Sequence, residues 1–293
     1  MFKTVLTLLS GTDCDELTLS SALRVVAGSG GHIECLRLMP DPAELIAQVA
    51  QVDSGGWMIL PDTIAAIEKE AKLRTEAARA SFETFCRQEN IETISDPTTK
   101  NVLSASFREA MGDEFDRVTE FGRYHDLIVL AGGHDRPGRL PEEALGGIII
   151  SGGRPVLLAS AGEGNGPFRK IAIAWKETAE AARAVTAAMP LLEQAQNIEV
   201  INVCETDKQA AQGNNNTDAL VSYLRWHSFD ANGHFLVPQD RTAGQAALEH
   251  AEQIGADLLI MGAYGHSRLR EFIFGGFTQR ILKGANLPVL LFH

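Results

Sequence analysis

An internal repeat constrains the fold of this chain more than any other feature of the sequence. Two segments recur in the same order: Asp126–Gly133 as Asp257–Tyr264, and Pro155–Ser160 as Pro288–His293. Their offsets along the chain, 131 (257 − 126) and 133 (288 − 155), agree closely, whereas a third pair, beginning at Lys3 and Lys170, has an offset of 167 (170 − 3). Because the order is preserved, we infer a duplication whose first copy carries about 35 extra residues in its middle.

The repeated segments are short, continuous apolar runs, as expected for strands that are covered on both faces of a parallel sheet. Between them lie patterns that predict helices: Leu17–Ala27, Asp62–Gln88, Val102–Gly112, Ala179–Gln194 and Ala243–Gln253. Strands that alternate with helices form open, doubly wound α/β sheets with right-handed crossovers. The fold class expected is therefore α/β, with two mainly parallel, five-stranded α/β sandwiches.

The repeat divides the 293 residues into a domain of residues 1–160 and a domain of residues 169–293. The glycine-rich stretch 161–167 between them is expected to be a flexible linker. The first domain carries its insertion between Met39 and Asp62. The corresponding part of the second domain, Glu205–Thr217, contains a Gly-Asn-Asn-Asn run and is expected to be a mobile loop.

Composition excludes several classes of protein. The formal net charge of −12 argues against a nucleic-acid partner, because a phosphate backbone would be repelled. The four cysteines are scattered without a C-x-x-C pair, which predicts free thiols and neither zinc nor disulfides. No apolar run is long enough to span a membrane, so we expect a cytoplasmic protein.

The clearest chemical signal is a pair of glycine clusters in the second copy. Gly262 and Gly265 directly follow an apolar strand, and Gly275 and Gly276 precede a predicted helix over Gln279–Lys283. Glycines in these places bring free N–H groups close to a ligand, and a helix N-terminus favours an anion such as phosphate. Further donors beside the loop are His266, Ser267, Arg268, Arg270 and Thr278.

The pattern Gly262-x-x-Gly265, nine residues and Gly275, with Pro288-Val-Leu-Leu291 after it, resembles the universal stress protein family in its tandem, two-domain form. The resemblance is strong over residues 169–293 and weak over 1–160. It implies a Rossmann-like fold of the adenine-nucleotide-hydrolase type. It also implies that ATP or another adenine nucleotide, with or without Mg²⁺, binds in the second domain at Gly262, Gly265, His266, Ser267, Gly275, Gly276 and Thr278.

The sequence departs from the family pattern at two kinds of position. Gly276 stands where the family has Ser or Thr, and Lys176 and Ser10 stand where nucleotide-binding members have an Asp that contacts adenosine. In the first copy, Arg136 replaces the second glycine, and Glu142 and Glu143 place negative charge where phosphates would lie. We expect no triphosphate in the first domain.

No P-loop, nucleophile elbow or His-Glu-x-x-His motif is present, so we predict no catalytic residue, no metal site and at most weak ATP hydrolysis. Three functions stay open. The first is a nucleotide-binding stress sensor or regulator, and the second is a nucleotide-independent interaction module built as an internal pseudo-dimer through Pro155–Ser160 and Pro288–His293. The third is a small-molecule binder whose ligand lies in the first domain near Trp57, Phe82 and Phe85. The family's habit of self-pairing also suggests a homodimer.

Overall fold

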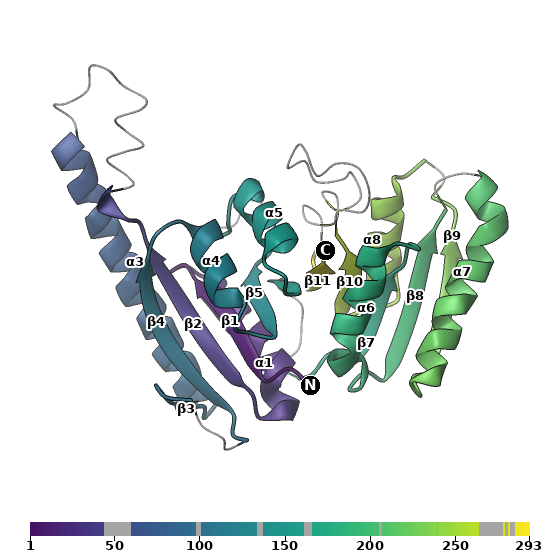
Figure 1. Cartoon of the computed structure of the whole chain (residues 1–293), viewed down its shortest axis with the longest axis horizontal. Coiled ribbons are helices and arrows are strands. Elements are labelled where there is room, and N and C mark those ends of the chain that lie inside the picture. The colour runs from purple at the N-terminus through teal and green to yellow at the C-terminus, as the bar shows by residue number, and fades with distance from the viewer. Residues whose placement is uncertain are drawn as a thin grey trace.

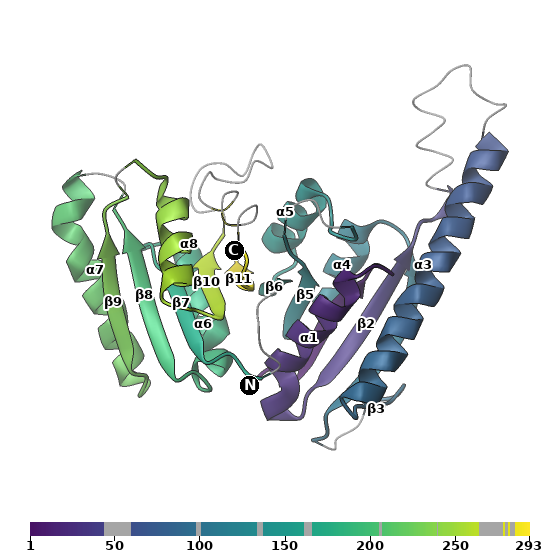
Figure 2. The same ribbon diagram turned by 180° about the vertical axis from the view of Figure 1, so that it is seen from behind.

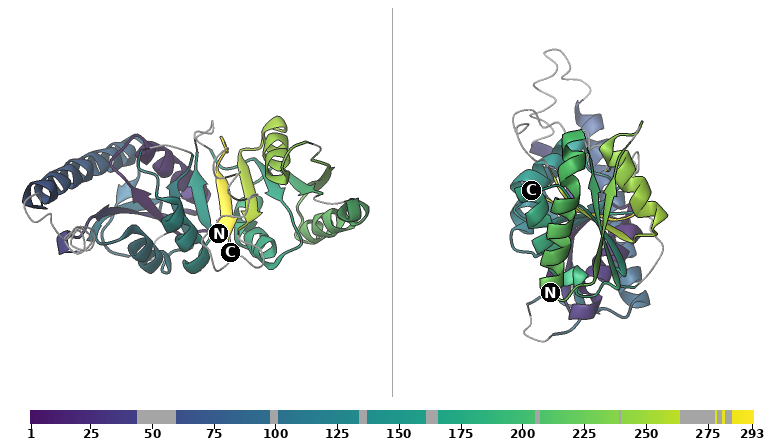
Figure 3. Two further views of the ribbon diagram at one scale, coloured as in Figure 1. Left: turned by 90° about the horizontal axis from the view of Figure 1, so that it is seen from above. Right: turned by 90° about the vertical axis from the view of Figure 1, so that its right-hand side faces the viewer.

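The fold is described from a computed structural model, in which all strands join one 11-stranded sheet (Figure 1). The residues described are 1–43, 60–97, 101–133, 137–160, 166–204, 207–238, 240–263, 278, 281 and 285–293. Most of the predicted linker 161–167 and most of the predicted insertion after Met39 lie outside them. The strand order is β3-β4-β2-β1-β5-β6-β11-β10-β7-β8-β9. Seen from above, the two halves of the chain lie end to end along the long axis of the molecule (Figure 3).

The first half of the chain contributes six strands and its own helices. Their bounds are β1 Thr4–Leu9, α1 Cys14–Val26, β2 His32–Met39, α3 Leu60–Gln88, β3 Glu92–Thr93, β4 Ser104–Met111, α4 Glu114–Gly122, β5 Leu127–Ala131, α5 Glu142–Ser151 and β6 Val156–Ala159. A short 3-10 helix, Ala27–Ser29, follows α1. Helices α4 and α5 cover one face of this half, and α1 and α3 cover the other (Figures 1 and 2).

The second half contributes five strands in the same arrangement. Their bounds, with those of the helices, are β7 Lys170–Ala174, α6 Ala179–Leu192, β8 Asn197–Val203, α7 Asp207–Trp226, β9 Ala231–Leu236, α8 Ala243–Gln253, β10 Leu258–Gly262 and β11 Val289–Phe292. Within each half every strand pair is parallel. The α/β class and the mainly parallel sheets predicted from the sequence are confirmed.

The two halves join through their last strands. β6 and β11 pair antiparallel, with Leu158 opposite Val289 and Leu157 opposite Leu290. These are the two segments from which the sequence predicted an internal pseudo-dimer, so the predicted pairing is confirmed. Arg24 adds a second connection, because its Nε donates to the carbonyl of Gly166 and its guanidinium lies 3.9 Å from the centre of the Phe168 ring.

Two buried apolar layers, one on each face of the sheet, run across the junction. One layer joins α1 and α3 to α6 and α7, and the other joins α4 and α5 to α8. The apolar stripe predicted on the helix after Pro61 is buried in the first layer at Ala78, Phe82 and Phe85. Apolar burial of this kind is the main stabilising contribution to the sheet.

Two local predictions are wrong. The stretch Val102–Gly112 holds strand β4, because Ser104–Met111 pairs along its whole length with β2 and presents alternate residues to opposite faces. The stretch Glu205–Thr217 enters helix α7 at Asp207, so the Gly-Asn-Asn-Asn run is helical. The Nδ2 group of Asn216 donates to Glu177 at 2.9 Å, which ties this part of α7 to the loop after β7.

Equivalent aspartates fix how the two halves superimpose. Asp126 accepts the amide hydrogens of Lys3 and Thr4 at 2.7 and 3.0 Å, and Asp257 accepts those of Arg169 and Lys170 at 2.8 and 3.1 Å. Lys3 is therefore equivalent to Arg169, an offset of 166 (169 − 3). The predicted offset of 167, which paired Lys3 with Lys170, is wrong by one position. It aligned two lysines by residue identity, whereas the residues that face the same side of the sheet are offset by 166.

Candidate functional site

The candidate site lies at the carboxyl ends of β7 and β10, where the strand order of the second half reverses. β7 pairs with β8 on one side and with β10 on the other, so the chain leaves β7 and β10 toward opposite faces. In open parallel sheets, ligands bind in the crevice outside such a switch point. The second half thus offers a binding position at the end of β10, where the predicted glycine loop begins.

Gly262 ends β10 and has a structural reason to be glycine. A Cβ atom at this position would lie 2.5 Å from the amide nitrogen of Ala181 and 2.7 Å from the carbonyl carbon of Glu180. The end of the strand therefore lies against the first turn of α6, and any larger residue would push them apart. This close approach brings the end of β10 beside a helix N-terminus.

Side chains of the protein itself occupy the N-terminus of α6, where an anionic ligand could otherwise bind. Thr178 caps the helix by accepting from the amide of Ala181 at 3.3 Å. The Glu180 carboxylate is desolvated by burial, but its own backbone amide, Thr178 and Arg183 outweigh this and lower its pKa. A phosphate would be repelled by this buried charge, so α6 is not the helix that would receive it.

Trp175 supplies a hydrogen-bond donor that the sequence analysis missed. It follows β7 directly, and its indole Nε1 is buried without a partner among the residues described. A buried N–H without an acceptor is costly, so it favours a ligand that brings an acceptor to this place. Lys176, the next residue, is exposed. The end of β7 therefore presents donors where nucleotide-binding family members present a carboxylate.

The predicted site residues fall into two groups. Gly262 lies at the switch point, and Thr278 is helical and buried, with 5% of its surface exposed. The other predicted residues, Gly265, His266, Ser267, Gly275 and Gly276, lie outside the described residues, as does most of the predicted helix Gln279–Lys283.

In the first half, the corresponding loop after β1 is closed by a carboxylate. Asp15 is buried and accepts from the amides of Ser10 and Gly11 at 2.7 and 2.9 Å, and from the Ser10 hydroxyl at 3.0 Å. The amide hydrogens of Ser10 and Gly11 therefore bond Asp15 and are not available to a ligand. Ser10, which stands at the family's Asp position, is part of this closure.

The glycines of the first-copy loop also serve packing. Gly146 and Gly147 lie inside α5 and are buried, and a Cβ atom at Gly147 would lie 2.7 Å from the ring of Phe115. They allow α5 to pack closely on α4. Glu142 and Glu143 occupy the first turn of α5, so the positive end of this helix dipole already has negative charge beside it.

Comparison with known proteins agrees with this organisation. Residues 235–293 match the universal stress protein family. Over its whole length the chain has the fold of a two-domain universal stress protein. The crystal structure of a universal stress protein from Archaeoglobus fulgidus DSM 4304 matches 99% of this chain and 97% of its own, with a TM-score of 0.61 and 13% identity.

Curated relatives match over a shorter span. A universal stress protein from Synechocystis is 41% identical over 51 residues, which is 17% of this chain and 18% of the relative. One from Methanocaldococcus jannaschii is 42% identical over 41 residues, which is 14% of this chain and 25% of the relative. A universal stress protein from Archaeoglobus fulgidus, solved in complex with dAMP, matches 43% of this chain at 19% identity and a TM-score of 0.36.

In the part of this chain that the structure describes, no helix is long and apolar enough to cross a membrane.

Proposed function

We propose that the second half of this universal stress protein binds ATP or another adenine nucleotide, with or without Mg²⁺, as a sensor or regulator of a stress response. The observation that carries the proposal is the position of Gly262. It stands at the switch point of the second sheet and against the first turn of α6, where the family's glycine pattern begins. The proposal includes the domain division 1–160 and 169–293 and a cytoplasmic location.

The chemistry of the site supports this assignment. Trp175 and Lys176 offer donors at the end of β7, and the glycine pattern from Gly262 to Gly276 offers backbone N–H groups. Because α6 is already capped by Thr178 and Glu180, the phosphates belong at the helix that contains Thr278. The adenosine part would then contact the end of β7 through donors and not through a carboxylate.

Titration with a fluorescent ATP analogue tests the proposal. The wild-type chain should bind the analogue saturably, and Gly265→Glu should weaken binding at least tenfold by placing a side chain and negative charge in the loop. Gly166→Glu is the matched control, because a Cβ atom at Gly166 meets no atom within 4 Å. Absence of saturable binding, or equal binding by wild type and Gly265→Glu, would rule out the assignment.

The alternative is a nucleotide-independent interaction module. Its support is the antiparallel pairing of β6 with β11, which builds a pseudo-dimer within one chain, together with the missing Asp at Lys176 and Ser10. A pull-down whose partner set is the same with and without ATP would favour the module. Partners that bind in ATP alone would favour the sensor. In either case a homodimer of the two-domain chain stays part of the proposal.

A further inference from the structure

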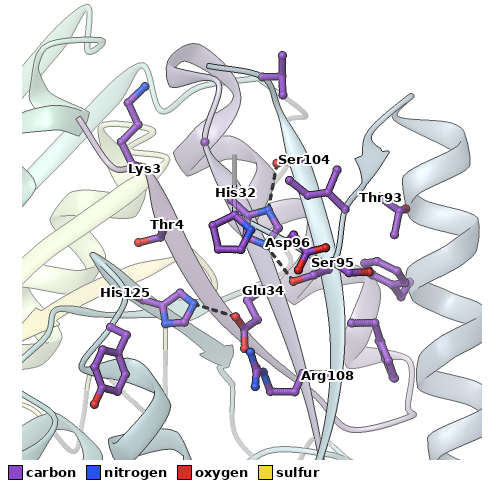
Figure 4. Close-up of a pocket in the computed structure, with 18 of the residues that line it drawn as sticks. Lys3, Thr4, His32, Glu34, Thr93, Ser95, Asp96, Ser104, Arg108 and His125 are labelled. Carbon is purple, nitrogen blue, oxygen red and sulfur yellow. Dashed lines mark hydrogen bonds and ion pairs between the residues drawn. The ribbon is translucent and has the colours of Figure 1, made fainter. Parts of the chain in front are cut away.

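A cavity lies in the first half, at the amino ends of the strands and away from the switch point of the second half. Its volume is about 1030 Å³. Its floor comes from β1, β2 and β4, and its rim includes Tyr124 and His125 before β5 and Ile94–Pro97 after β3 (Figure 4). Helix α4 ends at Gly122 and leaves this part of β2 and β4 uncovered (Figure 1).

The floor of this cavity is polar, although the same face of the sheet is apolar further along the strands. On β2, His32 and Glu34 are followed on the same face by the buried Leu36 and Leu38. On β4, the residues on this face are Ser104, Ser106 and Arg108. Polar and charged groups at partly buried positions stabilise a fold less than apolar ones do, so the change in pattern requires another reason.

The polar side chains are held in fixed positions. The two ring nitrogens of His32 lie 3.0 Å from the Ser104 hydroxyl and 2.9 Å from the Ser106 hydroxyl (Figure 4). Burial lowers the pKa of His32, so the ring is neutral at pH 7, with one nitrogen donating and the other accepting. The serine that accepts from the ring N–H can therefore donate its hydroxyl hydrogen to a ligand. The serine that donates to the other ring nitrogen can accept a hydrogen bond from a ligand.

Glu34 is an ionised carboxylate between two basic side chains. Arg108 Nε donates to one of its oxygens, and His125 Nε2 lies 3.6 Å from the other. The His125 imidazole beside it lowers the pKa of Glu34 to about 2 against the opposing effect of burial, with Arg108 adding to it. Among the described residues, Arg108 hydrogen-bonds no other side chain or carbonyl, its guanidinium lies 5.3 Å from the centre of the Phe121 ring, and half of its side chain is exposed. Its two Nη groups are thus available to a ligand.

The second half serves as an internal comparison. Glu199 is equivalent to Glu34, and His234 is equivalent to Arg108, and this pair is also bonded, at 2.7 Å. A buried glutamate paired with a basic side chain on the next strand therefore belongs to both copies. The positions of His32 and His125, however, hold Asn197 and Ala256 in the second half. The histidine with its two serines, and His125, are features of the first half alone and are not explained by the common fold.

The charges around the cavity select the class of ligand. Its charged lining residues are Lys3, Arg79, Arg108, Glu34, Glu83, Asp96 and Glu109. Of these, Arg79, Glu83 and Glu109 lie on the α3 side of β4, and the polar floor itself has Glu34 and Arg108, with Asp96 at its rim. Lys3 and Arg79 already bond Asn101 and Glu109. A phosphate would find no excess of positive charge, whereas a zwitterion would find both Arg108 and the exposed Asp96.

We propose that this cavity binds a free amino acid with an apolar side chain. The guanidinium of Arg108 receives the carboxylate through its Nη groups, as arginine does in forked carboxylate pairs. Asp96, which reaches over the floor from the segment after β3 (Figure 4), receives the ammonium group. Ile94 and Val102 provide apolar contacts for the side chain at the rim. The sequence placed a first-domain ligand near Trp57, Phe82 and Phe85. Phe82 and Phe85 belong to α3 and are buried in the core, on the other face of the sheet from His32, and Trp57 lies outside the described residues.

Isothermal titration of the full chain with L-leucine, L-methionine and L-phenylalanine tests this proposal. At least one of the three should bind saturably at one molecule per chain. For phenylalanine, 3-phenylpropionate lacks the ammonium group and phenethylamine lacks the carboxylate, so each should bind at least tenfold more weakly. Absence of saturable binding by all three amino acids up to about 10 mM, or equal binding of the analogues, would overturn the proposal.

Two variants locate the site. Arg108→Gln and Asp96→Asn should each weaken amino-acid binding at least tenfold, and Asp96 is exposed, so its replacement leaves the fold intact. Arg241→Gln is the matched control, because Arg241 forms a similar exposed pair with Glu249 in the second half. Binding that survives both Arg108→Gln and Asp96→Asn would place the amino acid elsewhere and overturn the assignment. ATP binding should be unchanged in all three variants, which separates this test from that of the nucleotide site.

Discussion

The two halves share one strand arrangement but differ in what lies at the end of their first strand. In the first half, Asp15 fills the loop after β1 by accepting from Ser10 and Gly11. In the second half, Trp175 at the same end has a buried indole N–H without a partner in the described part of the chain. The difference teaches that the duplicated fold does not require a ligand at this edge, because one copy completes it with its own carboxylate.

The comparison also separates structural features from functional ones. Features present in both halves, such as Asp126 and Asp257, are explained by the fold that the copies share. Features confined to one half, such as His32 with Ser104 and Ser106, call for a role of that half. Three predictions test this separation.

The largest effect is expected where the halves join. Leu290 is fully buried opposite Leu157, so Leu290→Ala should lower the free energy of unfolding by about 2–5 kcal/mol. Because the buried layers run across the junction, both halves should unfold together, with coincident urea transitions by circular dichroism and tryptophan fluorescence. Leu73→Ala, at a residue that is 52% exposed, should change stability by less than about 0.5 kcal/mol. Two separate transitions would show that the halves are independent units.

A smaller and nearly equal effect is expected at the paired aspartates. Asp126→Ala and Asp257→Ala each remove a carboxylate that accepts two backbone N–H groups, which should cost about 1–3 kcal/mol in urea unfolding. The Asp257 loss should be slightly larger, because its Oδ2 also lies 3.5 Å from Arg24 Nη2 of the first half. If one variant lost stability and the other did not, the two positions would not be structurally equivalent.

The smallest effect concerns how the free energy of unfolding depends on pH. His250 in α8 should contribute to this dependence, and the equivalent residue in α4, Thr119, should not. Burial, aided by the charge of His234, lowers the pKa of His250, and Glu199 opposes this effect. The His250 side chain then binds a proton more readily in the unfolded chain than in the folded one. Its contribution to the free energy of unfolding is therefore fully present above pH about 6.5 and is lost as the pH decreases.

The variant His250→Leu should flatten the urea stability profile between pH 7 and 5. The equivalent residue of the first half is Thr119, which does not titrate, so Thr119→Val should leave the slope unchanged. Equal slopes in wild type and His250→Leu would contradict the account of His250.

The sequence predicted the parts of the fold that depend on repeated local patterns. The nearly equal offsets of the two repeated segments match the pairings of β5 with β6 and of β10 with β11, since Ile128 and Val156 are paired as Leu259 and Val289 are. Strand β4 was mistaken for a helix because Ala105, Arg108, Glu109 and Met111 favour helices, whereas pairing with β2, which lies far earlier in the sequence, decides the outcome.

The sites were only partly predictable for a related reason. Gly262 could be found because its neighbours in sequence form a recognisable loop pattern. Trp175 gave no signal, since an unpartnered N–H is a property of the folded surroundings. Similarly, the contact of His125 with Glu34 joins distant parts of the sequence and could not be predicted from residue spacing.

The central claim is that the halves share a fold while the second half alone keeps a nucleotide site. Equilibrium dialysis of the full chain with radiolabelled ATP tests it most directly, by counting the molecules bound at saturation. We expect one ATP per chain in the wild type and in Gly166→Glu, and clearly less than one in Gly265→Glu at the ATP concentration that just saturates the wild type. No bound ATP would contradict it. So would two per chain, with the second at the first-half loop, where Nε and Nη2 of Arg139 are buried without partners among the described residues.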